Sequence, residues 1–169
     1  GNNRVLKVNT LNGSRVIYAG SGSRSDSGDG GLATDAGIFH PLGLAQDSQG
    51  NLYISSEAGY IRKVAFDTKN ISTIAGKPLG NGGSLVNQGD AENFAFAIPK
   101  GLALDEPNNL LYVADSLNNR IVRIDLTDGF ADSIAGDGSC GVVDPDQVVQ
   151  NDGEIALDIG LCVPSHIGL

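Results

Sequence analysis

A repeat that runs through the 169 residues constrains this chain more than any other feature. One motif ends in Ala-Gly three times and occupies residues 2–20, 59–76 and 118–136. A second motif alternates with it, begins at Pro41 and Pro99, and starts again at Val163. The closing glycines recur after 56 and then 60 residues. Self-similarity on this scale is typical of propellers and other repeat arrays.

Each repeat predicts four short strands. The first two are apolar runs at 43–47 and 52–55, and again at 101–105 and 110–114, separated by turn-forming residues. The third has a basic residue between apolar ones, which is typical of a strand with one wet face. Asn12-Gly13 and Asp128-Gly129 favour the tight turn that leads to the fourth strand. The sequence therefore predicts an all-β fold made of four-stranded antiparallel blades.

The order of these motifs resembles the NHL repeat family. The shared pattern is P-x-G-L-A-x-D, N-L-Y-[IV]-[AS], N-N-R-[IV]-x-[KR]-[VI] and [TS]-I-A-G, and G-D-G-G-L-A-T-D-A-G-I-F-H-P resembles the family's inter-repeat segment. The resemblance covers essentially the whole chain and implies an NHL-like β-propeller. The second copy departs from it with Tyr60, where the others have Arg4 and Arg120. The third departs after Pro164, because its next glycine, Gly168, comes two residues later than in the earlier copies.

The repeat boundaries predict an incomplete propeller. We expect residues 1–169 to be part of one propeller domain, with the end of a blade at 1–20, full blades at 41–76 and 99–136, and the start of another at 163–169. Propellers close with roughly four to eight blades. We therefore expect the rest of its own propeller, or further copies, among its partners.

The net charge of −9 comes entirely from the C-terminal part of the chain. Residues 1–123 hold eleven basic and eleven acidic side chains, whereas 124–169 hold nine acidic ones and no Lys or Arg. An acidic chain is a poor match for nucleic acid, whose binding depends on phosphate neutralisation. No apolar run approaches the about 20 residues of a membrane span. We expect neither nucleic acid nor a membrane span in this segment.

Two groups of aspartates offer the hard oxygen ligands that Ca²⁺ takes. They are Asp26 and Asp29 in one connection, and Asp137, Asp144, Asp146 and Asp152 in another. Neither group has the spacing of an EF-hand loop. The alternatives are a calcium site and a solvated acidic loop. Apart from calcium, we expect no cofactor.

Two further pairs of residues bear on the compartment. Cys140 and Cys162 lie 22 residues apart near the ends of the longest connection. A disulfide there would stabilise the fold by about 3 kcal/mol through loop entropy, and the alternative is two unpaired small core residues. Asn12 and Asn70 begin N-x-[ST] glycosylation sequons in the same hairpin turn of successive repeats. We expect both to be exposed, on the face opposite the long connections.

The loops between second and third strands, together with the long connections, should lie on one face of the propeller. One of these loops contains Asp115, Asn118 and Asn119, which we take as candidate contacts. Long loops on a rigid scaffold commonly bind partners. The alternative for Asp115 is a structural role, in which its carboxylate accepts hydrogen bonds from the turn backbone.

The resemblance implies a non-catalytic binding or scaffold module of a secreted or cell-surface protein, which contacts a protein or glycan ligand through loops on one face. One alternative is a structural subunit of an extracellular fibre or sheath. Another is a propeller enzyme of the lyase or lactonase type, whose metal ligands lie partly outside this chain. Zinc catalysis takes about three protein ligands, and His40 and His166 are the only histidines. We assign no catalytic residue.

Overall fold

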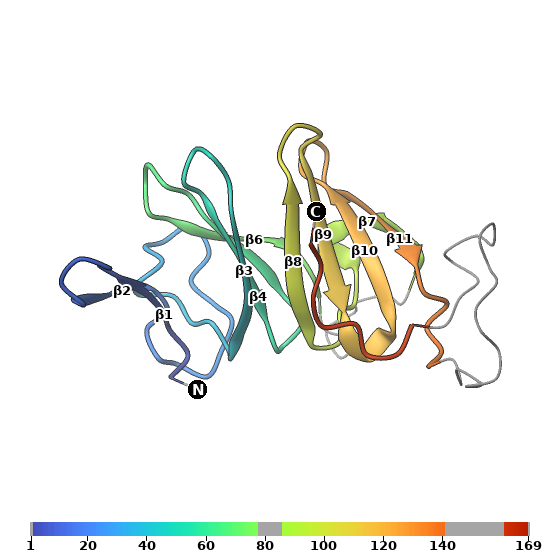
Figure 1. Cartoon of the computed structure of the whole chain (residues 1–169), viewed down its shortest axis with the longest axis horizontal. Helices are drawn as coiled ribbons and strands as arrows, with labels where there is room; N and C mark the ends of the chain where they lie inside the picture. Colours follow the sequence, from blue (N-terminus) through green and yellow to red (C-terminus); the bar gives the residue numbers. More distant parts are fainter. Residues whose placement is uncertain (1, 78–85, 141–160, 169) are drawn as a thin grey trace.

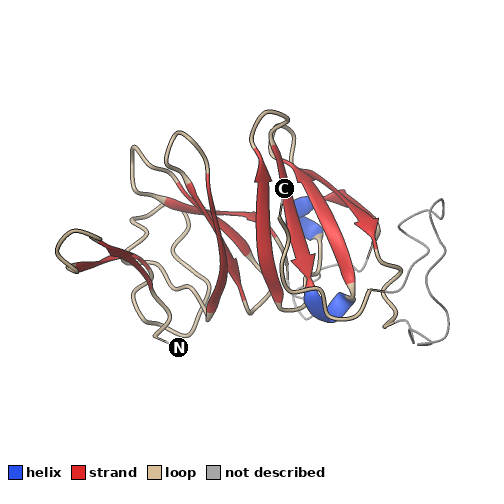
Figure 2. Ribbon diagram, in the orientation of Figure 1, coloured by secondary structure: helices blue, strands red, loops and turns tan. Residues whose placement is uncertain are grey.

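The computed structural model describes residues 2–77, 86–140 and 161–168, and its strands form three antiparallel sheets. In this part of the chain the only helical elements are two short 3₁₀ turns, η2 (Ala91–Asn93) and η3 (Ser116–Asn118) (Figure 2). The predicted all-β class is confirmed.

The sheets follow one another along the chain (Figure 1). The first is a hairpin of β1 (Val5–Val8) and β2 (Arg15–Ala19). The second has the order β3 (Pro41–Gln46), β4 (Leu52–Ser56), β5 (Ile61–Val64) and β6 (Ile71–Ala75). The third has the order β7 (Gln88–Asp90), β11 (Phe130–Ala135), β10 (Arg120–Asp125), β9 (Leu110–Asp115) and β8 (Pro99–Asp105). The second and third sheets are propeller blades, and the described strands do not close into a ring.

The core lies between neighbouring sheets. Tyr53 and Ile61 of the second sheet form one buried cluster with Phe94, Leu102 and Val113. These side chains come from both sheets and from the connection between them, so the strands bury one face against the next blade. The inner strands β3 and β8 lie side by side (Figure 1). Stacking of blades therefore supplies the apolar burial that a single blade lacks.

The connections predicted as loops also cover the outer edge of each blade, with a strand in the third sheet and with an isolated bridge in the second. β7 pairs with β11, and Leu32 forms a bridge with Asn70 next to β6. The Gly30 N–H donates to the Ile71 carbonyl oxygen at 2.8 Å. A free outer edge would be open to pairing with other chains, and these segments cover it. The sequence does not reveal them because the Gly-rich connections lack the alternation that marks a strand.

Glycine allows successive inner strands to approach each other. A Cβ on Gly43 would collide with the Lys100 carbonyl oxygen, and one on Gly101 would lie 2.9 Å from the Ser165 carbonyl oxygen and from the Cα of His166. Ser165 thus lies against β8 as Lys100 lies against β3. This aligns His166 with Gly43 and Gly101, so the third copy departs from the pattern because a histidine replaces the glycine.

Candidate functional site

The ends of the loops and connections meet at one face of the molecule, as the strand order predicts. The Asn118 side-chain amide donates to the Ala95 carbonyl oxygen at 3.0 Å, and the Asn119 amide donates to the Gly138 carbonyl oxygen at 3.3 Å. The Asn119 Oδ1 accepts the Val163 N–H at 3.0 Å. The β9–β10 loop is therefore joined to the connection before it and to the connection after it.

Asp115 holds this loop from the inside. Its side chain is fully buried, and it accepts hydrogen bonds from the Ala97 N–H at 2.7 Å, the Asn118 amide at 2.8 Å and Arg120 Nε at 2.8 Å. Burial raises the pKa of the Asp115 carboxyl, and these three donors oppose that rise. Asp115 lies in the predicted contact loop, but as a structural residue whose side chain no ligand can reach.

Arg120 extends this network into the blade. Its Nη1 donates to the Val86 carbonyl oxygen at 2.9 Å and to Ser133 Oγ at 3.3 Å, and its Nη2 donates to the Ala95 carbonyl oxygen at 3.2 Å. The guanidinium also lies 5.2 Å from the centre of the Phe94 ring. Arg120 therefore joins the connection before β8 to the strands of the third sheet. Together with the bonds of Asn119, this holds the backbone on both sides of the β9–β10 loop.

The most exposed side chain of the loop is apolar. Leu117, in η3, is 55% exposed, while its N–H donates to the Ala97 carbonyl oxygen at 3.0 Å. It borders a hollow of about 250 Å³, whose other walls include Asn87, Asn118 and Asp137. Leu117 could not be recognised from the sequence, because it stands alone between polar residues, where no periodic pattern marks it.

The acidic end of the chain borders the same hollow. Asp137 is exposed, and its carboxylate accepts the Ser139 N–H and hydroxyl, both at 2.7 Å. These bonds lower the pKa of Asp137, so the hollow has a negative rim. Close by along the chain, Cys140 and Cys162 form a disulfide with their Cα atoms 4.5 Å apart. The other predicted calcium ligands of this connection, Asp144, Asp146 and Asp152, lie outside the described residues.

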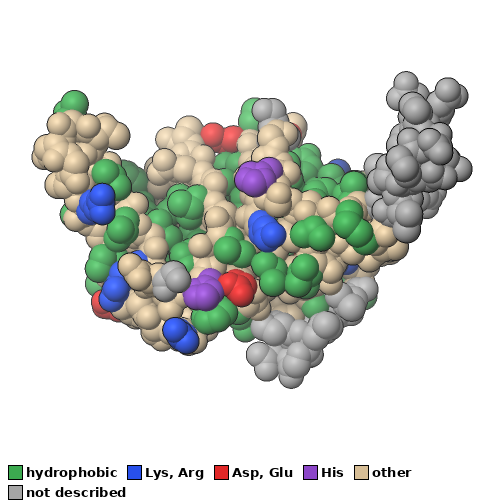
Figure 3. All heavy atoms as spheres, turned by 60° about the horizontal axis from the view of Figure 1, so that its bottom comes forward, with side chains coloured by type: hydrophobic (Ala, Val, Ile, Leu, Met, Phe, Trp, Pro, Cys, Tyr) green, Lys and Arg blue, Asp and Glu red, His purple; other side chains and the backbone are tan. Residues whose placement is uncertain are grey.

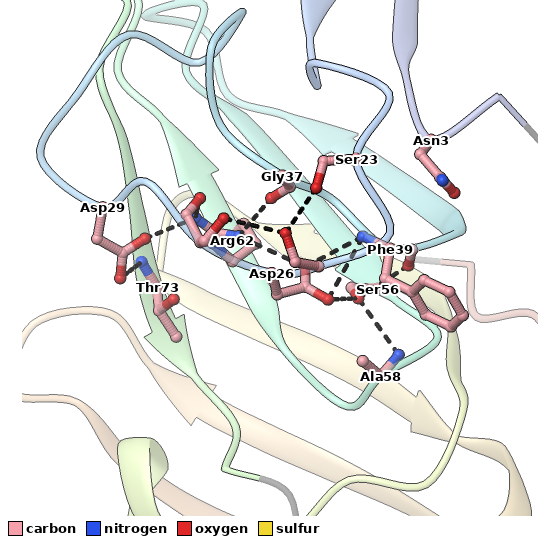
Figure 4. A network of polar contacts seen from close by, with 12 residues as sticks. Asn3, Ser23, Asp26, Asp29, Gly37, Phe39, Ser56, Ala58, Arg62 and Thr73 are labelled. Carbon is pink, nitrogen blue, oxygen red and sulfur yellow. Dashed lines mark hydrogen bonds and ion pairs between the residues drawn. The ribbon is translucent and has the colours of Figure 1, made fainter.

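Asp26 and Asp29, the calcium candidates of the first connection, bind the guanidinium of Arg62 (Figure 4). Arg62 Nη1 lies 3.4 Å from Asp26 Oδ1, and Nη2 lies 2.6 Å from Asp29 Oδ1. The Arg62 and Asp26 side chains are 0% and 2% exposed, whereas that of Asp29 is 50% exposed. Burial raises the pKa of Asp26, and hydrogen bonds from Ser56, Phe39 and Arg62 oppose that rise.

Arg62 is thus the cation that both carboxylates contact in this structure. Across residues 2–77, 86–140 and 161–168, no group of three or more His, Cys, Asp or Glu is placed to hold a metal ion. Calcium binding stays a prediction, and at Asp26 and Asp29 the ion would have to displace Arg62.

The two sequons differ in exposure. Asn12 is exposed in its turn, where its Oδ1 accepts the Ser14 N–H at 3.0 Å. Asn70 is half-buried beside Leu32, so the expectation that both sequons are exposed holds for Asn12 alone. The two hairpin turns have equal length, and Asn70 lies two positions further along its turn than Asn12 does. The connection that covers β6, which the sequence predicts only as a loop, accounts for the difference.

None of the described segments forms a helix with the length and apolar character needed to cross a membrane.

Comparison with known proteins supplies a family match. A family model described as NHL repeat matches residues 96–124, which include β8, β9 and most of β10. NHL repeat-containing protein 2 from Bos taurus and from Homo sapiens are each 36% identical to this chain over 98 residues, which are 57% of this chain. Protein SUPPRESSOR OF QUENCHING 1, chloroplastic, from Arabidopsis thaliana is 42% identical over 53 residues, or 31% of this chain. The matched stretches span only 13% and 5% of these relatives.

Solved structures share the fold over nearly the whole chain. An auxiliary nutrient binding protein from Bacteroides thetaiotaomicron superposes with a TM-score of 0.64 and 15% identity, over 98% of this chain and 37% of its own. A structural genomics protein of unknown function from the same organism superposes with a TM-score of 0.61 and 19% identity, over 98% and 36%. At sequence identities this low, the superpositions show a shared fold and nothing more.

Proposed function

We propose that this chain, a member of the NHL-repeat family, is an extracellular binding module that contacts its partner through the loops on one propeller face. The observation that carries this proposal is the contrast within the β9–β10 loop. Asp115 and Arg120 are buried and fix its backbone, while Leu117 at its tip is 55% exposed. Rigidly held loops with an exposed apolar tip are suited to binding, because little order is lost on association.

The chemistry of the face favours a protein partner or a glycan with an apolar patch. Leu117 supplies an apolar centre, and Asn87, Asn118 and Asp137 supply hydrogen-bonding groups around it. An apolar centre within a polar rim is the usual composition of a protein interface. A binding role in general is also supported by the solved relative that is named a nutrient binding protein.

The disulfide and the accessible sequon support the extracellular part of the proposal. A disulfide persists mainly in oxidising compartments, and Cys140 and Cys162 are paired. A glycan on Asn12 would stand on the hairpin turn, at the opposite end of the strands from the loop face, so it would leave that face free.

The binding proposal is tested by capture of ligands from an extracellular protein panel and a glycan array. Leu117→Ser removes the apolar centre, and Leu11→Ser is the matched control, since Leu11 is 96% exposed on the hairpin turn. We expect at least one ligand whose affinity falls about tenfold in Leu117→Ser, which corresponds to about 1.4 kcal/mol, and is retained in Leu11→Ser. Equal affinity of both variants for every ligand captured would contradict the proposal.

The compartment is tested on protein secreted from eukaryotic cells. We expect a glycosidase-sensitive mass shift that Asn12→Gln removes, and no free thiols until the unfolded protein is reduced. Two free thiols before reduction, or secretion without any glycan, would contradict the extracellular assignment.

A further inference from the structure

The inner strands border a second hollow, separate from the loop face. It has a volume of about 540 Å³, and its walls come from β3, β8 and the segment 165–167. The side chains that matter for its chemistry are Leu42, Leu44, Lys100, Leu102, Ser165 and His166. Among the described residues that line it, none has a carboxylate side chain. The chain as a whole has a net charge of −9, whereas the described lining of this hollow has one basic side chain and no acidic one.

Lys100 provides the positive charge of this wall. In the part of the chain that the structure describes, no carboxylate forms an ion pair with Lys100. The equivalent position is Leu42 in the preceding inner strand and Ser165 in the following one. The repeat therefore needs no lysine here for folding, and the charge is specific to this position.

His166 adds a second polar side chain to the hollow, at a position where the other two inner strands have glycine. The equivalent residues, Gly43 and Gly101, allow close approach of the next inner strand. The His166 Nδ1 lies 2.9 Å from Ser165 Oγ. When the Ser165 hydroxyl donates to Nδ1, the neutral ring carries its proton on Nε2 and can donate a hydrogen bond to a ligand.

The rest of the hollow is apolar. Leu42 and Leu44 are 44% and 51% exposed, and Leu102 lies on the neighbouring strand. Figure 3 shows hydrophobic side chains around a basic side chain on this face, between the two histidines. A single cation beside an apolar wall matches a ligand with one anionic group and a hydrocarbon body.

We propose that this hollow binds a small aliphatic carboxylic acid. The carboxylate lies at Lys100 and the imidazole of His166, and the hydrocarbon lies against Leu42 and Leu44. This site is independent of the partner site on the loop face, and Leu117→Ser leaves it unchanged.

Calorimetric titration of the full chain with hexanoate tests the proposal, with hexanol and inorganic phosphate as the two partial probes. Lys100→Met keeps the side-chain length and removes the charge, and Lys7→Met is the matched control on exposed β1. We expect the dissociation constant of hexanoate to rise about tenfold in Lys100→Met, because a charge-assisted hydrogen bond is lost. We expect a change of less than about twofold in Lys7→Met.

Two more variants keep the outcome decisive. Lys100→Arg preserves the charge and should bind hexanoate within about threefold of the parent. His166→Gly restores the residue of the other two repeats, so it should fold normally and bind hexanoate more weakly. No binding of hexanoate, equal binding by Lys100→Met, or binding by hexanol as tight as by hexanoate would overturn the proposal. Binding of phosphate as tight as that of hexanoate would also overturn it, because the site would then recognise charge alone.

Discussion

The second sheet (β3–β6) and the third sheet (β7–β11) each bury one aspartate beside one arginine, but they take these residues from different places in the chain. In the third sheet, Asp115 and Arg120 are five residues apart and flank the same loop. In the second sheet, Asp26 comes from the preceding connection and Arg62 from inside β5, 36 residues later. The ion pair recurs although the sequence positions differ.

The two aspartates also accept a hydrogen bond from the equivalent backbone N–H in their two repeats. Asp115 accepts the N–H of Ala97, and Asp26 accepts the N–H of Phe39 at 3.4 Å; each donor lies two residues before the proline that opens the inner strand. Ser56 takes the position of Asp115 at the end of its strand, and its hydroxyl donates to Asp26 Oδ2 at 2.7 Å. Repeats of this kind thus preserve a contact in space rather than a residue in the sequence.

Loss of either arginine is the largest expected effect. Arg62→Met and Arg120→Met each leave a buried carboxylate without its cation, so each should lower the free energy of unfolding by about 3–5 kcal/mol. Urea denaturation followed by circular dichroism measures this. If Arg62→Met costs less than 1 kcal/mol while Arg120→Met is severe, the two pairs are not equivalent.

The next effect concerns the junctions between neighbouring blades. Asn3 and Asn119 have positive φ angles of 51° and 50°, and their Oδ1 atoms accept an N–H at the start of the next inner strand. Gly59 takes this place in the second sheet, with a φ of 92°, and a Cβ there would lie 2.5 Å from the Phe96 carbonyl oxygen.

Gly59→Asn should therefore destabilise the protein by about 2–3 kcal/mol, because the backbone of the connection must move. Asn119→Gly is the reverse change and should alter global stability by only about 1 kcal/mol, since it loses two solvent-exposed hydrogen bonds while glycine adopts the positive φ more readily than asparagine. Thermal unfolding of both variants measures the difference. Equal melting temperatures would show that the two junctions are interchangeable.

A smaller effect is expected at Asp29. Its carboxylate binds Arg62 but its side chain is 50% exposed, so water can replace the bond. Asp29→Asn should cost less than about 1 kcal/mol in urea denaturation, and Asp26→Asn, at a buried position, should cost more. A larger cost for Asp29→Asn would mean that the exposed carboxylate is the main partner of Arg62.

The last effect is confined to alkaline pH and is expected in the second sheet only. Burial, followed by the charge of Asp47, raises the pKa of Tyr53 from 10.0 to about 12. Between these values the unfolded chain loses the phenol proton first, so stability falls as pH rises from about 10 to about 12. Tyr53→Phe should weaken this fall, and Tyr112→Phe, at the same register position of the third sheet, is the control. An unchanged pH profile in Tyr53→Phe would contradict this assignment.

The strands were predictable because their apolar runs and turn dipeptides recur in register, and β4 and β9 lie close to the predicted positions 52–55 and 110–114. Arg62 was not recognised, because its partners Asp26 and Asp29 lie 36 and 33 residues away and no local pattern links them to it. The Arg62 side chain places its guanidinium between these two aspartates of the preceding connection, and this orientation depends on tertiary packing. Leu117 was missed for a similar reason, since a single exposed leucine has no sequence pattern.

The equivalence of the two buried ion pairs is tested most directly by two double-mutant cycles, measured as free energies of unfolding in urea. One cycle combines Asp26→Asn with Arg62→Met, and the other combines Asp115→Asn with Arg120→Met. Since each pair is buried and in contact, we expect coupling energies of about 1–3 kcal/mol in both cycles. A coupling energy near zero for Asp26 and Arg62, beside a large one for Asp115 and Arg120, would contradict the equivalence of the two ion pairs.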